Sequence, residues 1–214
     1  LTGLLGSPVA HSISPLMHNE SFRLLGLDYV YLCFDVNEET LPAAVAGLKT
    51  CGIRGFNLTM PNKNKIVELL DELSPEAQLI GAVNTVLNDN GKLIGYNTDG
   101  YGFMQSVRDA GHDITGKNIT VMGVGGASMA ICAQSGLDGA ASVHIFARRT
   151  SRYWNRTQKF AENLSAKTGC QVCLFDNDDH TALRDSIAQS YLLINATSVG
   201  MVPDIDDTII KDTS

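Results

Sequence analysis

The chain has 214 residues, of which 44% are hydrophobic and 18% are charged, and its formal net charge is −7. This composition is typical of a globular protein with one large or two small domains. The acidic balance argues against a nucleic-acid partner, and no stretch approaches the roughly 20 apolar residues that a membrane-spanning helix needs.

The cysteines favour a reducing compartment. Five of them are scattered along the chain, and an odd number without a spacing pattern is typical of free thiols in a cytoplasmic protein. Cys170 and Cys173 form a C-x-x-C pair, an arrangement that also occurs in redox and metal sites. A metal would need a second pair or a suitably spaced histidine, and the sequence offers neither. We interpret the pair as structural thiols and predict no metal site.

Strand and helix patterns alternate in the first half of the chain. The first helix is expected to begin with Ser14 as its cap and Pro15 in its first turn, and to end before Gly26. The expected strands cover 1–6, 29–36 and 53–60, with a hairpin over 84–97. Further helices are expected over 38–52 and 65–73, and a short one from Ser74–Pro75. This alternation predicts a mainly parallel sheet covered by helices.

The second half repeats the alternation around a glycine turn. The expected helices cover about 100–110, 152–167 and 179–188, and the expected strands 116–122, 142–149, 171–175 and 191–197. This pattern is typical of a Rossmann-like dinucleotide-binding unit. We therefore predict two α/β domains, 1–99 and 100–214. Residues 206–214 resemble the opening of another element, so we expect the natural chain to continue beyond Ser214.

The stretch "VMGVGGAS" places three glycines directly after a strand and at the start of a helix. Gly123 permits the tight turn, Gly125 allows the backbone to approach a pyrophosphate, and Ser128 is small enough for close helix–strand packing. The helix N-terminus attracts phosphate. The alternative is a tight turn between strand and helix, as in any α/β protein. The flanking elements favour a cofactor site.

The next strand ends in "FARRTSRYWNR", where an enzyme that prefers NAD usually carries an acidic residue for the ribose hydroxyl. No acid occurs between Asp138 and Glu162, whereas Arg148 and Arg149 stand at the strand end. Arginine there suits a 2′-phosphate. This pattern predicts NADP as the cofactor, with NAD possible. The alternative is that Arg152 and Arg156 form a solvated helix face, and this alternative fits Arg156 but not Arg148.

Four polar clusters follow or precede strands in the first half: "HSISP" (11–15), "NLTMPNK" (57–63), "GAVNT" (81–85) and "YNTDG" (96–100). Strand ends in an α/β sheet meet in one crevice, so we expect a polar ligand site there. The candidate residues are Ser12, Ser14, Thr59, Lys63, Asn84 and Asp99. The alternatives are a surface lysine after a turn for Lys63 and a helix cap for Asp99.

The motifs "SISPLMHN", "NLTMPNK", "GAVNT", "NTDG", "GVGGAS" and "NATSVGM" occur in order along nearly the whole chain, which resembles the shikimate dehydrogenase family, including its quinate/shikimate branch. By this resemblance Ser12 and Ser14 hold the substrate carboxylate, and Thr59 and Asn84 bind ring hydroxyls. Lys63 and Asp99 are then the catalytic pair. The first domain binds the small-molecule substrate, and the enzyme is a monomer or homodimer that uses neither nucleic acid nor membrane.

The resemblance also implies a set of cofactor contacts. These are Gly123, Gly125, Gly126, Ala127, Ser128, Arg148, Arg149, Thr197, Ser198 and Val199. The chain departs from the family at Ala147, where asparagine is common, and at Val124 and Thr150. The family's substrate-binding glutamine and a further glycine-rich cofactor contact lie in a C-terminal segment beyond these 214 residues.

The implied activity is an NADP-dependent shikimate dehydrogenase that reversibly reduces 3-dehydroshikimate to shikimate in aromatic amino-acid biosynthesis. A quinate/shikimate dehydrogenase that uses NAD or both cofactors stays open, because one hydroxyl in a pocket is not readable from sequence. A non-catalytic metabolite sensor on the same fold is the alternative of another class, although a sensor needs no proton relay.

Overall fold

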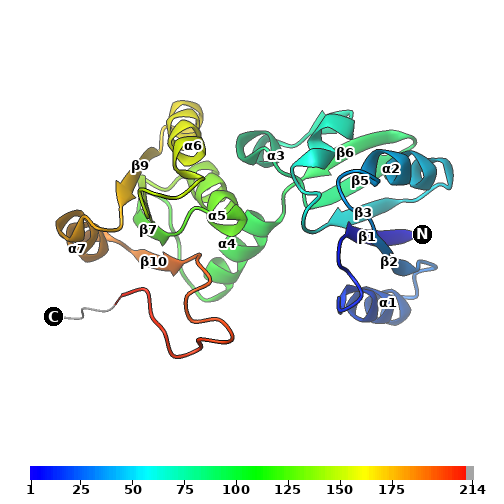
Figure 1. Ribbon diagram of the computed structural model, residues 1–214, viewed down its shortest axis with the longest axis horizontal. Coiled ribbons are helices and arrows are strands. Elements are labelled where there is room, and N and C mark those ends of the chain that lie inside the picture. The colour runs from blue at the N-terminus through cyan, green and yellow to red at the C-terminus, as the bar shows by residue number, and fades with distance from the viewer. Residues whose placement is uncertain (211–214) are drawn as a thin grey trace. The chain divides into compact units, whose positions relative to one another are not determined.

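The computed structural model describes residues 1–210, which form two compact units, Leu1–Thr98 and the residues from Asp99 onward. Each unit has its own sheet and its own helices (Figure 1). The predicted α/β class, with one mainly parallel sheet and one Rossmann-like unit, is confirmed. Within the described residues, no helix combines the length and the apolar character needed to cross a membrane.

The sheet of the first unit has six strands in the order β2-β1-β3-β5-β6-β4. Their bounds are β1 Thr2–Gly6, β2 Tyr31–Asp35, β3 Gly55–Leu58, β4 Glu72–Leu73, β5 Thr85–Asp89 and β6 Lys92–Tyr96. β1 pairs in parallel with both β2 and β3, and β4 in parallel with β6. β5 is antiparallel to β3 and to β6, so the predicted hairpin is confirmed.

The helices of the first unit are α1 (Ser14–Leu24), α2 (Leu41–Thr50), the 3₁₀ helix η1 (Lys65–Leu69) and α3 (Pro75–Ile80). Ser74 caps α3 as expected, since its Oγ accepts a hydrogen bond from the Ala77 N–H at 3.3 Å. The prediction for Ser14 was wrong: it is the first residue of α1, and the cap position is Ile13 without a side-chain bond.

The continuous helix predicted over 65–73 was also wrong. The segment forms η1 and then the short edge strand β4. Asp71 exchanges two hydrogen bonds with Leu93: its N–H donates to the Leu93 carbonyl at 3.0 Å, and its Oδ2 accepts from the Leu93 N–H at 2.7 Å. This pairing against β6 outweighs the local helical preference of the sequence.

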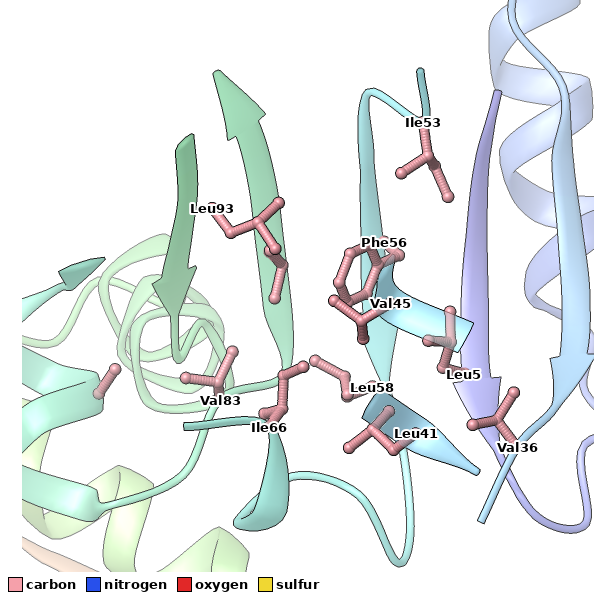
Figure 2. Packing of buried hydrophobic residues seen from close by; sticks show 12 residues of the cluster. Leu5, Val36, Leu41, Val45, Ile53, Phe56, Leu58, Ile66, Val83 and Leu93 are labelled. Atoms are coloured by element: carbon pink, nitrogen blue, oxygen red, sulfur yellow. The ribbon is translucent and has the colours of Figure 1, made fainter. Parts of the chain in front are cut away.

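The core of the first unit lies between the sheet and α2. Leu5 points to this side and is fully buried, and Figure 2 shows Val45 of α2 gathered with Phe56 and Leu58 of β3. Leu4 points to the opposite face, where a smaller cluster forms near α1. This alternation follows from the two-residue period of a strand.

The sheet of the second unit has four parallel strands in the order β10-β7-β8-β9. The strands are β7 Asn118–Met122, β8 Ser142–Ala147, β9 Gln171–Asp176 and β10 Leu192–Asn195. The helices are α4 Asp99–Asp109, α5 Gly126–Leu137, α6 Trp154–Thr168 and α7 His180–Gln189. Figure 1 shows α5 and α6 on one side of this sheet and α7 on the other.

The strand order of this second sheet reverses at β7. The chain runs from β7 to β8 and β9 on one side, and β10 returns to the other side of β7. Such a switch point opens a crevice beyond the carboxyl ends of the two neighbouring strands. Residues 206–210 form neither helix nor strand, and the remainder of the element expected over 206–214 lies outside the described residues.

Candidate active site

One edge of the first sheet collects the predicted substrate residues. β1 and β3 are parallel, with Leu5 opposite Leu58, so both strands end at this edge. β5 is antiparallel to β3, with Asn57 opposite Thr85, so it begins there, and β6 ends there by the same pairing. The connections at this edge carry Ser12, Ser14, Thr59, Lys63 and Asn84.

The loop after β3 is held against the end of β1. The Thr59 N–H donates to the Leu5 carbonyl at 3.1 Å, and the Ser7 N–H donates to the Met60 carbonyl at 3.0 Å. The Thr59 side chain packs on Gly6, where an added Cβ would lie only 2.2 Å from the Thr59 Cγ2. A glycine at the end of β1 is therefore needed for Thr59 to occupy this position.

The two predicted catalytic residues lie in different units. Lys63 lies between the loop after β3 and η1, is partly buried, and accepts a hydrogen bond at its carbonyl from the Val83 N–H at 2.8 Å. Asp99 is the exposed first residue of α4. A carboxylate in the first helical turn is favoured by the positive end of the helix dipole.

Asn84 is 9% exposed and is fixed in one orientation. Its Oδ1 accepts hydrogen bonds from the Thr98 N–H and from the Thr85 hydroxyl, both at 3.0 Å. Its Nδ2 lies 3.0 Å from the Thr98 hydroxyl oxygen. Because a backbone N–H can only donate, the atom facing it must be the amide oxygen. A ligand hydroxyl at this position would then accept a hydrogen bond from the amide nitrogen.

A chain of hydrogen bonds supports Asn84 from across the sheet. The Tyr31 hydroxyl donates to the Asn57 Oδ1 at 2.8 Å, and the Asn57 Nδ2 donates to the Thr85 hydroxyl at 3.0 Å. Burial raises the pKa of the Tyr31 phenol above its ordinary value, so the hydroxyl stays a neutral donor. No role at the site was expected from the sequence for Tyr31, Asn57, Thr85 and Thr98. The available signal was that these residues lie near the paired strand ends that meet at this edge of the sheet.

Ser12 and Ser14 lie at the start of α1 and are both partly buried. The Ser12 Oγ accepts a hydrogen bond from the Ser14 N–H at 3.2 Å. This contact brings the two side chains to the same helix end. Hydroxyl groups beside the N–H groups of a helix N-terminus suit an anionic ligand.

In the second unit, the glycine turn follows β7 with two kinds of glycine. Gly123 has φ +111°, its N–H donates to the Phe146 carbonyl at 2.8 Å, and an added Cβ would lie 2.9 Å from the Ala196 carbonyl oxygen. Gly125 and Gly126 are exposed, and an added Cβ at either would meet nothing within 4 Å. Gly123 is therefore required by the fold, whereas the other two leave the start of α5 uncovered.

Ser128 stabilises the glycine turn from the interior of the second unit. It is completely buried, and its hydroxyl donates to the Gly123 carbonyl at 2.6 Å. Ala127 is exposed in the first turn of α5. Ala127 therefore belongs to the exposed first turn of α5, and the backbone N–H groups of a helix N-terminus suit a phosphate.

The arginines after β8 are exposed, and α6 begins only at Trp154, two residues later than expected. The Arg149 guanidinium lies 4.7 Å from the centre of the Trp154 ring. Arg152 stacks on Tyr153 at the same distance and donates to its hydroxyl at 2.6 Å, so it lies in the turn before the helix and not on a helix face. Arg148 follows the last residue of β8.

The loop after β10 is braced by Asn195. Its Oδ1 accepts from the Thr197 N–H at 3.0 Å and from the Thr197 hydroxyl at 2.7 Å, and its Nδ2 donates to the Val199 carbonyl at 3.0 Å. Thr197 lies against Gly123, since an added Cβ at Gly123 would be 2.9 Å from its Cγ2. The predicted residues Thr197, Ser198 and Val199 therefore lie in the loop that adjoins the glycine turn.

The cysteines are free thiols in residues 1–210. Burial raises the pKa of Cys170 to about 11 and that of Cys132 to about 12, so both thiols stay protonated near neutral pH. No group of three histidine, cysteine or acidic side chains in the described part of the chain is placed to hold a metal ion.

Together, the second unit has the architecture of a Rossmann-like dinucleotide-binding domain, and the first offers a polar edge of hydroxyl, amide and ammonium groups. Residues 4–86 match the family model of the shikimate dehydrogenase substrate binding domain. A relative from Listeria innocua, named shikimate dehydrogenase (NADP(+)), is 50% identical over 210 residues, which are 98% of this chain and 72% of the relative. The chain belongs to the shikimate dehydrogenase family.

Solved structures agree with this relationship. The crystal structure of shikimate 5-dehydrogenase from Listeria monocytogenes in complex with shikimate and NAD superposes with a TM-score of 0.96 at 48% identity, covering 99% of this chain and 73% of that chain. The ligand-free 5-ketofructose reductase of a Gluconobacter strain superposes with a TM-score of 0.81 at 32% identity, covering 93% of this chain and 69% of that chain.

Proposed function

We propose that this protein is an NADP-dependent shikimate dehydrogenase, which reversibly reduces the ring ketone of 3-dehydroshikimate to the hydroxyl of shikimate. The observation that carries the proposal is the 50% identity to a shikimate dehydrogenase (NADP(+)) along 98% of the chain. The polar edge of the first unit and the glycine turn of the second supply the two kinds of binding group that this reaction needs.

Residues 1–99 form the substrate domain in this proposal, and the residues from 100 onward form the cofactor domain. Ser12 and Ser14 hold the substrate carboxylate at the start of α1. The Thr59 hydroxyl accepts a hydrogen bond from a ring hydroxyl or donates one to it. Asn84 donates a hydrogen bond to a ring hydroxyl through its amide nitrogen. The amide oxygen of Asn84 already accepts hydrogen bonds from Thr85 and Thr98, which supports the amide nitrogen as the donor to the ligand.

Lys63 and Asp99 are the proposed catalytic pair. Reduction of a ketone by hydride places negative charge on the carbonyl oxygen, and this oxygen must gain one proton to become the hydroxyl. The Lys63 ammonium stabilises the developing charge and donates that proton. In the reverse direction the neutral amine accepts it. The Asp99 carboxylate accepts a hydrogen bond from a substrate hydroxyl and thereby orients the ring.

The residues of the second unit fit a dinucleotide. When bound, NADP(H) supplies or accepts the hydride. The backbone N–H groups at Gly125, Gly126 and Ala127 would hold the pyrophosphate, since all three residues are exposed and a Cβ added at either glycine would meet nothing within 4 Å in the described part of the chain. Thr197, Ser198 and Val199 would border the nicotinamide side. Ser128 would act from within by fixing the Gly123 carbonyl.

The choice of NADP rests on Arg148 and Arg149. Both are exposed after β8, where the sequence has no carboxylate to bind a ribose hydroxyl. Trp154 holds the Arg149 guanidinium 4.7 Å from its ring centre, which leaves Arg148 as the more direct cation for a 2′-phosphate. A relative named for NADP(+) supports this choice, and the Listeria monocytogenes complex with NAD keeps dual use open.

The test follows the absorbance of the reduced cofactor at saturating NADP with shikimate, quinate or a 5-ketofructose/fructose pair as substrate. Turnover with shikimate and little with the other two supports the proposal. Preferential turnover with quinate supports the quinate/shikimate alternative, and turnover with the sugar pair follows the Gluconobacter neighbour. Binding without turnover of any substrate supports the metabolite sensor.

A cytoplasmic location and a monomeric or dimeric assembly are also part of the proposal. The free thiols support a reducing compartment. Analytical ultracentrifugation of the purified protein measures the assembly state, and one species at one or two chain masses is the expected result.

A further inference from the structure

Lys63 stands in the middle of a stretch whose neighbours are each tied to a different segment of the first unit. On one side, the Asn62 Nδ2 donates to the Val36 carbonyl at 2.7 Å, directly after β2. On the other, the Asn64 Nδ2 donates to the Gly81 carbonyl at 2.8 Å, at the end of α3. Together with the hydrogen bond from the Val83 N–H to the Lys63 carbonyl, these contacts fix the position of the Lys63 backbone.

Asn62 differs from Asn64 in its surroundings. Asn62 is completely buried, whereas Asn64 is exposed. The Asn62 N–H also donates to the Thr59 carbonyl at 3.0 Å, and its carbonyl accepts from the Ile66 N–H at 3.1 Å. Asn62 thus joins the loop after β3, the beginning of η1 and the end of β2 through one residue.

The side-chain amide of Asn62 lowers the stability of the fold through one of its atoms. Its Oδ1 is buried and has no hydrogen-bond partner among residues 1–210. An unpaired buried carbonyl is unfavourable, and such groups in native proteins call for an explanation. An apolar residue of similar size would avoid this cost but would leave the Val36 carbonyl without its donor. The bond to the Val36 carbonyl is therefore the contact that an amide at this position supplies and an apolar residue would not.

We propose that Asn62 is a positioning residue for catalysis, which holds the backbone of Lys63 so that the ammonium reaches the reacting oxygen. This inference rests on the proposed role of Lys63 as proton donor. A positioning residue affects the rate of the chemical step more than the binding of substrate, because a displacement of about 1 Å can cost on the order of 10²-fold in rate.

The first experiment compares Asn62→Ala with Asn88→Ala. Asn88 is a matched control: it is also buried, its Nδ2 donates to the Ile53 carbonyl at 2.8 Å, and it lies at the hairpin turn away from the site edge. Both variants should unfold at lower urea concentration than the parent. Only Asn62→Ala should lower kcat, by about 10–100-fold, with KM for shikimate changed less than about threefold. Equal kcat losses in the two variants, normalised to folded protein, would overturn the proposal.

A double-mutant cycle with Lys63→Ala separates positioning from a general structural role. If Asn62 acts through Lys63, Asn62→Ala should lower kcat in the parent but cause no further loss in the Lys63→Ala background. The same fold-loss in both backgrounds would refute the inference and leave the proposed function intact. If Lys63→Ala itself leaves kcat unchanged, the catalytic assignment fails, and the inference fails with it.

Discussion

The glycine turn allows a prediction in which two neighbouring substitutions have opposite consequences. Gly123→Ala places a Cβ 2.9 Å from the Ala196 carbonyl oxygen, at a φ of +111° that side chains rarely adopt. Gly125→Ala places a Cβ in open space, at a φ of −81° that any residue adopts. The first change should damage the fold, and the second should affect only a ligand that approaches the backbone.

The magnitudes follow from these geometries. Strain at a positive φ is unfavourable by about 1–3 kcal/mol, and the overlap at Gly123 adds to it. At Gly125, alanine stabilises the fold by about 0.4–1 kcal/mol because it lowers the entropy of the unfolded chain. It destabilises the fold by about as much because alanine is a poorer helix cap than glycine, so the free energy of unfolding should hardly change. Displacing a pyrophosphate from one charge-assisted contact there should cost about 1.5–3 kcal/mol, or roughly 10–150-fold in cofactor affinity.

The assay combines urea unfolding with fluorescence titration of NADPH. We expect Gly123→Ala to shift the unfolding midpoint downward, and Gly125→Ala to keep the parent midpoint while binding NADPH at least about 10-fold more weakly. Parent-like NADPH affinity in a folded Gly125→Ala protein would refute the pyrophosphate site at this turn.

Three further substitutions test the proposed carboxylate site, the cofactor preference and a buried histidine. Replacing both Ser12 and Ser14 by alanine should raise KM for shikimate at least about 10-fold and leave NADPH affinity unchanged, because they are assigned to the carboxylate alone; a joint loss of both affinities would assign them to the fold. Arg148→Ala should lower kcat/KM for NADP by roughly 10–150-fold and that for NAD little, whereas an unchanged NADP constant would contradict its role. His144 lies 2.9 Å from the Ser186 hydroxyl, and burial lowers the pKa of its imidazole below the ordinary histidine value. The unfolded chain therefore binds the proton more readily, and the free energy of unfolding falls as the pH drops below about 6.5, the ordinary pKa of histidine. His144→Gln should remove part of the decline in stability that urea unfolding measures between pH 7.5 and pH 5.

The alternation of strands and helices was readable from the sequence because its signals are local. Periodicity and turn residues predicted the hairpin of β5 and β6, the capped start of α3 at Ser74, and the strand, glycine turn and helix around Gly123. The segment 65–73 failed because its structure is set by a partner far along the chain: Asp71 pairs with Leu93 of β6. Local helical preference does not contain that contact.

The site was predicted as a set of motifs, and its supporting contacts were not. Strand ends that meet at one edge follow from parallel topology, so Thr59 and Asn84 were expected there. The hydrogen bonds that orient Asn84 through Thr98 and Thr85 depend on strand register and side-chain direction. The burial of Asn62, one position before Lys63, likewise follows from how the loop packs and not from its composition.

The proposed reaction is the reduction of a ring ketone with Lys63 as the proton donor. The most direct measurement is kcat for shikimate with NADP in the parent, in Lys63→Ala and in Lys65→Ala. Lys65 is a matched control, a lysine two residues on whose side chain is 40% exposed and pairs with Glu68 at 2.7 Å. We expect a loss of roughly 10²–10⁴-fold in kcat for Lys63→Ala, the usual contribution of a positioned proton-transfer group, and a parent-like value for Lys65→Ala. A kcat within a few-fold of the parent in Lys63→Ala would contradict this role of Lys63.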